Sequence, residues 1–325
     1  MTTIPASRTN GRVPFADLPE GSPFIRPPFD IAPFRHLYPW RSRWLMRNGQ
    51  VLHYLDEGSG APLVLLHGNP TWSFYYRRLI QTLASRCRLI VPDHMGCGLS
   101  SRPTDAAFSY TLQSHADNLE DLLDHLGLGK GVTLVMHDWG GAIGMACACR
   151  RPGRIARVIV LNTGAFLIPP AKRLPWPLWF VKRTPLLPAL LVRGLNAFSL
   201  GAAYLGAKNG LPPEIRRAYT APYGSWRNRI ATLRFVQDIP VTPRDRSYAL
   251  TAWVDDHLHL FREIPMLICW GEKDFVFDRT IREEWQRRFP DAEAAIFPEA
   301  GHYLLEDAPG SVIEKIVDFL DRHPL

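Results

Sequence analysis

The chain has 325 residues, of which 46% are hydrophobic and 21% charged, and its formal net charge at pH 7 is +7. This composition is that of a globular protein and excludes a disordered, collagen-like or coiled-coil chain. The five cysteines are scattered and show no paired Cys-x-x-Cys spacing. We therefore expect a reducing compartment, and neither a disulfide framework nor a structural zinc site.

Residues 1–35 contain seven prolines. Because proline fixes φ and removes a backbone donor, this segment predicts an extended N-terminal arm without a helix or a central strand. The first 24 residues contain no apolar run typical of a signal peptide, and no uncharged apolar run in the chain reaches about 20 residues. We therefore expect a cytoplasmic protein. Its lysines and arginines are spread along the chain, which argues against nucleic acid as a partner.

Short apolar runs that end in turn residues recur along the rest of the chain, as is typical of strands buried on both faces. The expected strands of this kind are residues 62–66, 89–91, 132–136, 158–161, 266–270 and 294–297. Residues 50–55 alternate weakly and predict a half-exposed strand. Amphipathic stretches predict helices over 112–126 and 312–320, and a shorter apolar helix begins near residue 142. Strands that alternate with helices predict an α/β fold with a mostly parallel central sheet flanked by helices.

The alternation is interrupted once, over residues 164–250, which are rich in proline, tryptophan and leucine. We interpret this segment as a helical cap domain inserted between two parts of the core, residues 36–163 and 251–325. Its large apolar side chains suit a small hydrophobic substrate with long alkyl chains. The side chains expected to serve this purpose are Phe166, Trp176, Trp179, Phe180, Leu187 and Phe198.

A candidate nucleophile lies where the strand over 132–136 gives way to a helix, in the stretch 137–141. A residue on such a strand-to-helix turn has its side chain pushed out over the sheet, and Gly140 and Gly141 allow the helix to begin close by. The position holds Asp138, whose carboxylate can attack carbon and form a covalent ester. Met136 stands where the general pattern has glycine, and a helix N-cap is the competing interpretation of Asp138.

The loop after the strand over 62–66 spans residues 67–72 and would supply a backbone N–H to the same site. Asn69 in this loop and Trp139, next to the nucleophile, both carry side-chain N–H groups. Two such donors beside a carboxylate can bind a developing anion without a metal. We therefore expect Asn69 and Trp139 to stabilise the anion or oxyanion of the reaction.

A general base and an orienting acid are expected further along the chain. His302 follows the strand over 294–297, where the order nucleophile, acid, histidine places the base. Asp274 follows the strand over 266–270 and is the acid that we expect to orient His302. The other place for an acid, after the preceding strand, holds Asn162, which cannot carry the charge. Two acidic residues are alternatives to Asp274: Glu272 and Asp278.

The other histidines are expected to be structural. His67 and His94 are expected to hold loops, and His137 should point to the opposite face of its strand from Asp138. Residues 255–259 resemble a cluster of metal ligands, but a solvated polar segment is the favoured interpretation. No glycine loop suited to phosphate is present. Nucleophilic attack by a carboxylate, with a histidine and an acid, needs neither a metal nor an organic cofactor, and we expect neither.

The motifs at 67–72 and 137–141, together with Asp274 and His302, resemble the haloalkane dehalogenases of the α/β-hydrolase fold, from about residue 36 to the end. Asparagine and tryptophan as donors, with the acid after the later strand, form a pattern similar to that of the third subfamily of these enzymes. This subfamily is closely related to the β-lactone decarboxylases of long-chain olefin biosynthesis. Epoxide hydrolases share the aspartate nucleophile but usually carry an aromatic residue in place of Asn69. The stretches of the cap that resemble the decarboxylases are 169–172, 196–199, 217–223, 226–230 and 234–240.

The resemblance implies a decarboxylase that converts a cis-3,4-dialkyl β-lactone into a cis-alkene and carbon dioxide. Asp138 would attack carbon, Asn69 and Trp139 would hold the anion, and His302 with Asp274 would release the enzyme. A haloalkane dehalogenase, which forms halide and an alcohol through an alkyl-enzyme ester, is the first alternative and uses the same residues. An inactive hydrolase-like binding subunit is the second. The resemblance also implies assembly with other enzymes of the olefin pathway.

Overall fold

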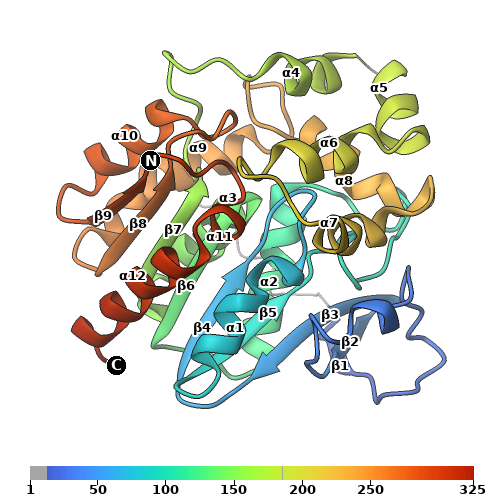
Figure 1. Cartoon of the computed structure of the whole chain (residues 1–325), viewed down its shortest axis with the longest axis horizontal. Coiled ribbons are helices and arrows are strands. Elements are labelled where there is room, and N and C mark those ends of the chain that lie inside the picture. Colours follow the sequence, from blue (N-terminus) through green and yellow to red (C-terminus); the bar gives the residue numbers. More distant parts are fainter. Residues whose placement is uncertain (1–12, 185) are drawn as a thin grey trace.

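The computed structural model describes residues 13–184 and 186–325, and a nine-stranded sheet forms the centre of this part of the chain (Figure 1). The strand order is β1-β2-β3-β5-β4-β6-β7-β8-β9. Strands β4 to β9 run parallel, and β1 to β3 form an antiparallel edge. The mostly parallel sheet predicted from the sequence is therefore confirmed. The strands are β1 (Ala16–Asp17), β2 (Arg43–Arg47), β3 (Gln50–Glu57), β4 (Ala61–Leu66), β5 (Cys87–Pro92), β6 (Val132–Asp138), β7 (Ile155–Thr163), β8 (Met266–Gly271) and β9 (Glu293–Phe297).

The central strands correspond to the continuous apolar runs of the sequence. Every residue of β6 and β8 is buried, because helices cover both faces of the sheet at these positions. Strand β4 shows how its side chains divide between the faces: Val64 and Leu66 pack into one hydrophobic core, and Leu63 and Leu65 pack into the other. The sheet therefore separates two cores, and its buried strands hold the loops at their carboxyl ends in place.

Helices of the core lie on both faces of the sheet. Those with their apolar side in the first core are α2 (Leu112–His125), α3 (Trp139–Arg150), α9 (Tyr248–His257) and α10 (Arg279–Arg288). Those that contribute to the second core are α1 (Arg77–Leu83), α11 (Leu304–Asp307) and α12 (Pro309–Arg322). The helices predicted over 112–126 and 312–320 correspond to α2 and α12. Helix α2 begins where the hydroxyl of Thr111 accepts a hydrogen bond from the backbone N–H of Ser114.

The segment 164–250 folds into short helices that form a layer above the sheet in Figure 1. They are α4 (Trp176–Arg183), α5 (Leu187–Ala189), α6 (Ala197–Leu205), α7 (Pro213–Thr220) and α8 (Ile230–Gln237), with a π-helical turn at Leu190–Gly194. Buried contacts attach this layer to the core: the indole N–H of Trp72 donates to the carbonyl of Ala218 at 3.1 Å. None of the helices in residues 13–184 and 186–325 combines the length and apolar character needed to span a bilayer.

The N-terminal arm packs on the core over its described residues. Strand β1 pairs with β2 at the edge of the sheet, and Phe29 contacts the edge of the Trp72 ring with centroids 5.5 Å apart. Residues Ala32–Phe34 form one turn of 3-10 helix, which departs from the expected extended arm. The reason is that Pro33 lies in the first turn, where the missing N–H needs no partner.

A buried ion pair provides a test of how the layers are held together. Arg77 of α1 donates two N–H groups to Glu306 of α11, the second at 2.7 Å, and the Tyr219 hydroxyl of α7 donates to the same carboxylate. Both charged side chains are 4% exposed. Because Glu306→Ala leaves a buried guanidinium without its partner, we expect the free energy of unfolding to fall by about 3–5 kcal/mol in urea titrations. Asp321→Ala, which removes a surface partner of Arg86, should leave the midpoint unchanged; equal effects of the two variants would contradict this account.

Candidate active site

The backbone at Asp138 is held in an uncommon conformation. This residue ends β6 and precedes α3, with φ of 51° and ψ of −124°. Such a conformation costs roughly 1–3 kcal/mol for a non-glycine residue and persists only where the surrounding structure enforces it. Three glycines make the turn possible: a Cβ at Gly68 would collide with the Asp138 carboxylate, at Gly140 with the Leu66 carbonyl, and at Gly141 with the Thr163 side chain. The competing N-cap interpretation finds no support, because Asp138 makes no side-chain cap bond to its helix.

The two carboxylate oxygens of Asp138 have different surroundings. Oδ1 accepts the backbone N–H of Asn69 at 2.6 Å, and the nearby backbone N–H of Trp139 also favours the ionised carboxylate. Oδ2 lies 3.7 Å from Nε2 of His302. Burial raises the pKa of Asp138 above its ordinary value, and His302 and the two N–H groups only partly offset this. The backbone N–H of Asn69, which would form part of an oxyanion hole in a serine hydrolase, therefore holds one oxygen of the nucleophile, and the other oxygen faces His302.

His302 is oriented by the predicted acid. Its Nδ1–H donates to Oδ2 of Asp274 at 2.8 Å, and both side chains are buried. Oδ1 of Asp274 accepts backbone N–H groups from Val276 at 2.7 Å and Phe277 at 3.1 Å. Burial alone would lower the pKa of His302, but the charge and hydrogen bond of Asp274 raise it above the ordinary value. The structure thus brings Asp138, His302 and Asp274 together in one buried row.

Asn162 carries no charge and cannot be the acid, but the structure places it directly behind the acid. Its amide nitrogen donates to Oδ2 of Asp274 and to the Gly271 carbonyl, each at 3.0 Å, and its amide oxygen accepts the Gly271 N–H at 2.8 Å. Asn162 therefore positions the carboxylate that orients His302. The two alternative acids lie elsewhere: Asp278 caps α10 and pairs with Lys172, and Glu272 pairs with Arg282.

The side chains of Asn69 and Trp139 flank the nucleophile on the side of α8. The amide nitrogen of Asn69 donates to the carbonyl of Thr232 in α8 at 3.1 Å. Its amide oxygen is buried and has no hydrogen-bond partner within the described residues. The Trp139 ring contacts Phe235 of α8, with centroids 5.1 Å apart. Both predicted anion donors therefore lie where α8 meets the nucleophile, and their role stays a prediction.

His137 points away from Asp138, as predicted, but its position has a consequence for the base. Its Nε2–H donates to the backbone carbonyl of His302 at 2.8 Å. Its ring stacks on Tyr75, with centroids 4.3 Å apart and planes at 24°. His137 therefore fixes the backbone of His302 from the second core, a role that the sequence pattern alone did not indicate.

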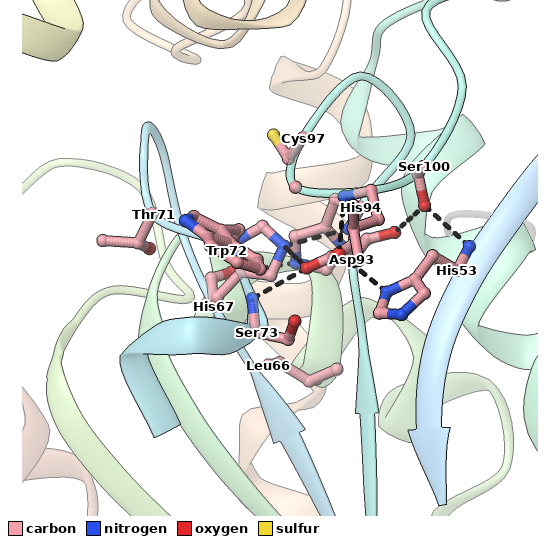
Figure 2. Close-up of polar contacts among 12 residues, drawn as sticks. His53, Leu66, His67, Thr71, Trp72, Ser73, Asp93, His94, Cys97 and Ser100 are labelled. Carbon is pink, nitrogen blue, oxygen red and sulfur yellow. Dashed lines mark hydrogen bonds and ion pairs between the residues drawn. The ribbon is translucent and has the colours of Figure 1, made fainter. Parts of the chain in front are cut away.

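A second buried carboxylate, Asp93, holds the loop that carries Asn69 (Figure 2). It accepts hydrogen bonds from the backbone N–H of Ser73 at 2.7 Å, from that of Leu99 at 2.8 Å and from Nδ1 of His53 at 2.8 Å. Burial alone would raise the pKa of Asp93, but its contact with His53 brings the pKa below the ordinary value. Sequence reasoning did not identify this residue, although it directly follows β5 in a loop otherwise rich in glycine.

The prediction that His67 and His94 hold loops is confirmed. Nε2 of His67 accepts the backbone N–H of His94 at 2.9 Å, and Nε2–H of His94 donates to the carbonyl of His67 at 2.8 Å (Figure 2). The loops after β4 and β5 are thereby tied together beneath the nucleophile. Since burial lowers the pKa of both rings, these histidines stay neutral and act as hydrogen-bonding groups.

The segment 255–259 does not converge on a common point. Asp255 accepts the backbone N–H of Leu167 at 3.0 Å, and the Nδ1 atoms of His257 and His259 bond to separate backbone carbonyls at 2.7 and 2.8 Å. Across residues 13–184 and 186–325, no group of three or more His, Cys, Asp or Glu side chains could hold a metal ion. The five cysteines are free and buried.

The apolar side chains expected to face a substrate divide into two groups. Phe166 is buried against Trp285 with ring centroids 5.4 Å apart. Trp176, Trp179 and Leu187 are instead exposed, at 71%, 49% and 51%. The reason is that α4 turns its other side, with Val181, toward α8. Phe180, which stacks on Trp176, and Phe198 are half-buried, and the expectation that these side chains suit alkyl chains stays a prediction.

Comparison with known proteins places this geometry in a family. The family model described as alpha/beta hydrolase fold matches residues 61–309. A cis-3-alkyl-4-alkyloxetan-2-one decarboxylase of Shewanella oneidensis is 51% identical over 285 residues, which are 87% of this chain and 89% of that protein. A protein of the same name from Xanthomonas campestris is 43% identical over 287 residues, which are 86% of this chain and 95% of that one. The crystal structure of the haloalkane dehalogenase DatA from Agrobacterium tumefaciens has a TM-score of 0.78 at 25% identity and covers 87% of this chain and 97% of DatA.

The chain belongs to the α/β-hydrolase fold family, within the group that contains these cis-3-alkyl-4-alkyloxetan-2-one decarboxylases and the haloalkane dehalogenases. The fold class and the resemblance predicted from the sequence are thereby confirmed. The chain is more similar to the two decarboxylases than to the dehalogenases, of which one from Mycobacterium tuberculosis is 34% identical.

Proposed function

We propose that this protein is a cis-3-alkyl-4-alkyloxetan-2-one decarboxylase, which converts a β-lactone with two alkyl chains into a cis-alkene and carbon dioxide. The observation that carries the proposal is the buried Asp138 carboxylate on a positive-φ turn, with His302 and Asp274 aligned behind it. The names of relatives at 51% and 43% identity support the substrate class. In this proposal, residues 164–250 are the cap that encloses the alkyl chains.

The proposed reaction begins with attack of Asp138 Oδ2 on C4, the ring carbon that carries both an alkyl chain and the ring oxygen. The bond from Oδ2 to carbon forms as the carbon–oxygen bond of the ring breaks, and the lactone carbonyl group becomes a free carboxylate. Loss of carbon dioxide then moves its electron pair into the new carbon–carbon double bond and expels the Asp138 carboxylate. Inversion at the attacked carbon followed by anti elimination retains the cis geometry, and no water or redox partner is consumed.

The hydrogen bonds of Asp138 favour attack at this carbon over attack at the carbonyl. An acyl mechanism needs free backbone N–H donors for a tetrahedral oxyanion. Here the backbone N–H of Asn69 already binds the nucleophile. We therefore assign the side-chain N–H groups of Asn69 and Trp139 to the departing carboxylate. The Asn69 amide would exchange its bond to the Thr232 carbonyl for one to the ligand.

His302 and its neighbours serve the release of the enzyme in this proposal. The raised pKa of His302 favours its protonated form, which stabilises the Asp138 carboxylate as it leaves. Asp274 holds the imidazole in place, and Asn162 holds Asp274, so both are positioning residues. For a haloalkane, the neutral imidazole would instead have to activate water for hydrolysis of the ester.

Removal of one anion donor tests the assignment of Asn69. We expect Asn69→Ala to lower kcat for alkene formation by about 10²–10³-fold, or about 2.7–4 kcal/mol, as for loss of one oxyanion donor. The rate should be measured with saturating lactone by gas chromatography of the alkene. The backbone N–H to Asp138 is retained in this variant, so the nucleophile keeps its orientation. A rate within about threefold of the wild type would remove Asn69 from the site.

Separate incubations with two substrate classes distinguish the candidate functions. The purified protein is offered a cis-dialkyl β-lactone or a series of bromoalkanes, and alkene and bromide are measured. Alkene without bromide turnover supports the decarboxylase. Bromide turnover without alkene would establish a haloalkane dehalogenase. This is the second candidate, and it is supported by the similarity to the DatA structure at 25% identity. Absence of both products would favour the inactive binding subunit.

We also propose that the enzyme is cytoplasmic and assembles with other enzymes of the olefin pathway. The five free, buried cysteines support a reducing compartment. The family resemblance supports the assembly. Size-exclusion chromatography of a mild lysate tests it, since the protein should elute well before its own monomer and together with its pathway partners. Elution as a monomer at all concentrations would contradict the assembly.

A further inference from the structure

Large apolar side chains are exposed on and around the short helices between residues 176 and 226. Sixteen large apolar residues are exposed in the described chain, and ten of them fall between residues 176 and 226. We call these ten the outer apolar surface: Trp176, Trp179, Leu186, Leu187, Leu190, Leu195, Leu200, Tyr204, Leu205 and Trp226. An apolar concentration of this kind marks a surface that another apolar phase or partner covers.

The exposure follows from the orientation of regular helices. Trp176, Trp179 and Arg183 are spaced three and four residues apart on α4 and are all exposed, whereas Val181 on the other side is buried against α8. Helix α4 thus carries large apolar side chains on both of its sides, and only the side with Val181 has a partner within the described chain. Figure 1 shows α4 and α5 along the upper rim of the molecule, on the side of the carboxyl ends of the central strands, with α6 between them and α7.

The segment that carries most of this surface contributes only basic charged side chains. No aspartate or glutamate occurs from residue 139 to residue 213. Six basic residues fall between 164 and 213, of which Arg173, Arg183 and Lys208 are exposed. Lys172 and Lys182 are paired with acidic residues that come later in the chain. The outer apolar surface is therefore bordered by cations alone within its own segment.

A basic recess adjoins one edge of this surface. Its volume is about 210 Å³, and its lining includes Arg102, Arg193, Arg227 and Asp105. Asp105 is already paired with Arg234, at 2.7 Å, so the three arginines leave a net positive charge. The guanidinium of Arg193 stacks on Trp226 at 4.6 Å, which joins the recess to the outer apolar surface. Such a recess suits an anionic phosphate headgroup.

We propose that the outer apolar surface docks on an anionic lipid bilayer. Tryptophan and leucine beside arginine and lysine are the side chains that lie at a membrane interface, where apolar groups enter the acyl boundary and cations attract anionic headgroups. Residues 139–213 contain no aspartate or glutamate. An anionic membrane would repel such residues, whereas a protein partner of ordinary composition would tolerate them. Docking would place α4 to α6 against the phase that dissolves long alkyl chains; this consequence alone rests on the proposed function.

Vesicle flotation of the full-length protein tests the docking. We expect the protein to float with vesicles of phosphatidylcholine and phosphatidylglycerol, to remain behind with phosphatidylcholine alone, and to be released at high salt. Arg183→Gln should weaken binding about fivefold, the effect of one cation near the surface. The triple variant Leu186→Ser, Leu190→Ser, Leu195→Ser should abolish it. Leu260→Ser, at a leucine that is 41% exposed outside the outer apolar surface, is the matched control and should bind like the wild type.

The outcomes separate this proposal from its competitors. Equal flotation of the triple variant and the wild type would overturn it, as would flotation that does not depend on phosphatidylglycerol. A wild type that stays off vesicles but self-associates in a concentration-dependent way, with the triple variant monomeric, would mean that a second copy covers the surface. Thermal unfolding and turnover of detergent-dispersed lactone should be unchanged in the triple variant. If the wild type lacked lactone turnover, only the proposed function would fail, since flotation is measured without substrate.

Discussion

Asp138→Ala is expected to abolish alkene formation, with a fall in kcat of about 10⁴-fold or more, as for the loss of other catalytic nucleophiles. The reason is that Oδ2 of Asp138, which lies 3.7 Å from Nε2 of His302, is the atom that attacks carbon in the proposed reaction. The measurement is alkene by gas chromatography at saturating lactone. An Asp138→Ala variant that retained more than a hundredth of the wild-type rate would show that Asp138 is not the nucleophile.

The same site should show a trade-off between function and stability. The folded-state pKa of Asp138 lies above its ordinary value of 3.8, so the folded state binds the proton more tightly than the unfolded state does. Its contribution to stability is therefore favourable in acid and is lost as the pH rises through the folded pKa. We expect Asp138→Asn, which cannot ionise, to be more stable than the wild type in urea at neutral pH. The difference should shrink as the pH falls toward 3.8; a variant less stable at every pH would contradict this sign.

His302→Ala is expected to affect the two candidate substrates very differently. With a bromoalkane, the variant should release one bromide per enzyme and then stop, because hydrolysis of the alkyl ester needs a base to activate water. Intact mass spectrometry should then show Asp138 alkylated. With the β-lactone, turnover should continue at a reduced rate, because decarboxylation itself expels the carboxylate. His257→Ala, which removes a histidine bonded only to a backbone carbonyl, is the control.

The pH dependence of the wild type provides an independent check on the role of His302. Hydrolysis of a haloalkane needs neutral His302, so any such activity should be lost as the pH falls through the raised pKa of His302. Alkene formation needs ionised Asp138 and should persist to lower pH, failing only near the pKa of that carboxyl. Two profiles that coincide would mean that both reactions use His302 as a base.

Much of the fold and of the candidate site is encoded in short stretches of the chain. The buried strands β4, β6, β7 and β8 appear as continuous apolar runs, because a strand covered on both faces has no solvent side. The turn at Asp138 is signalled by the glycines that make its backbone possible. Asp274 and His302 follow strands at the same edge of a parallel sheet, so their convergence could be expected from strand order.

Other features depend on groups that meet only in three dimensions. Asn162 supports Asp274 across two neighbouring strands, and His137 supports the His302 backbone from the opposite face of β6. The Asp93 carboxylate accepts hydrogen bonds from backbone N–H groups of two loops. No local pattern distinguishes these polar side chains from solvated ones, because the partners of Asn162 and His137 lie more than 100 residues away and those of Asp93 come from two loops.

The sequence by itself determined the order of strands and helices, the nucleophile turn and the residue types of the candidate site, because these depend on local periodicity and on backbone chemistry. Only the tertiary structure decided which oxygen of Asp138 is free and which polar residues support His302. It also decided that Trp176 and Trp179 face outward, since an apolar residue on a helix can pack on either side. The physical reason is that the burial of a side chain depends on how whole layers of helices and strands pack, and not on the residue type alone.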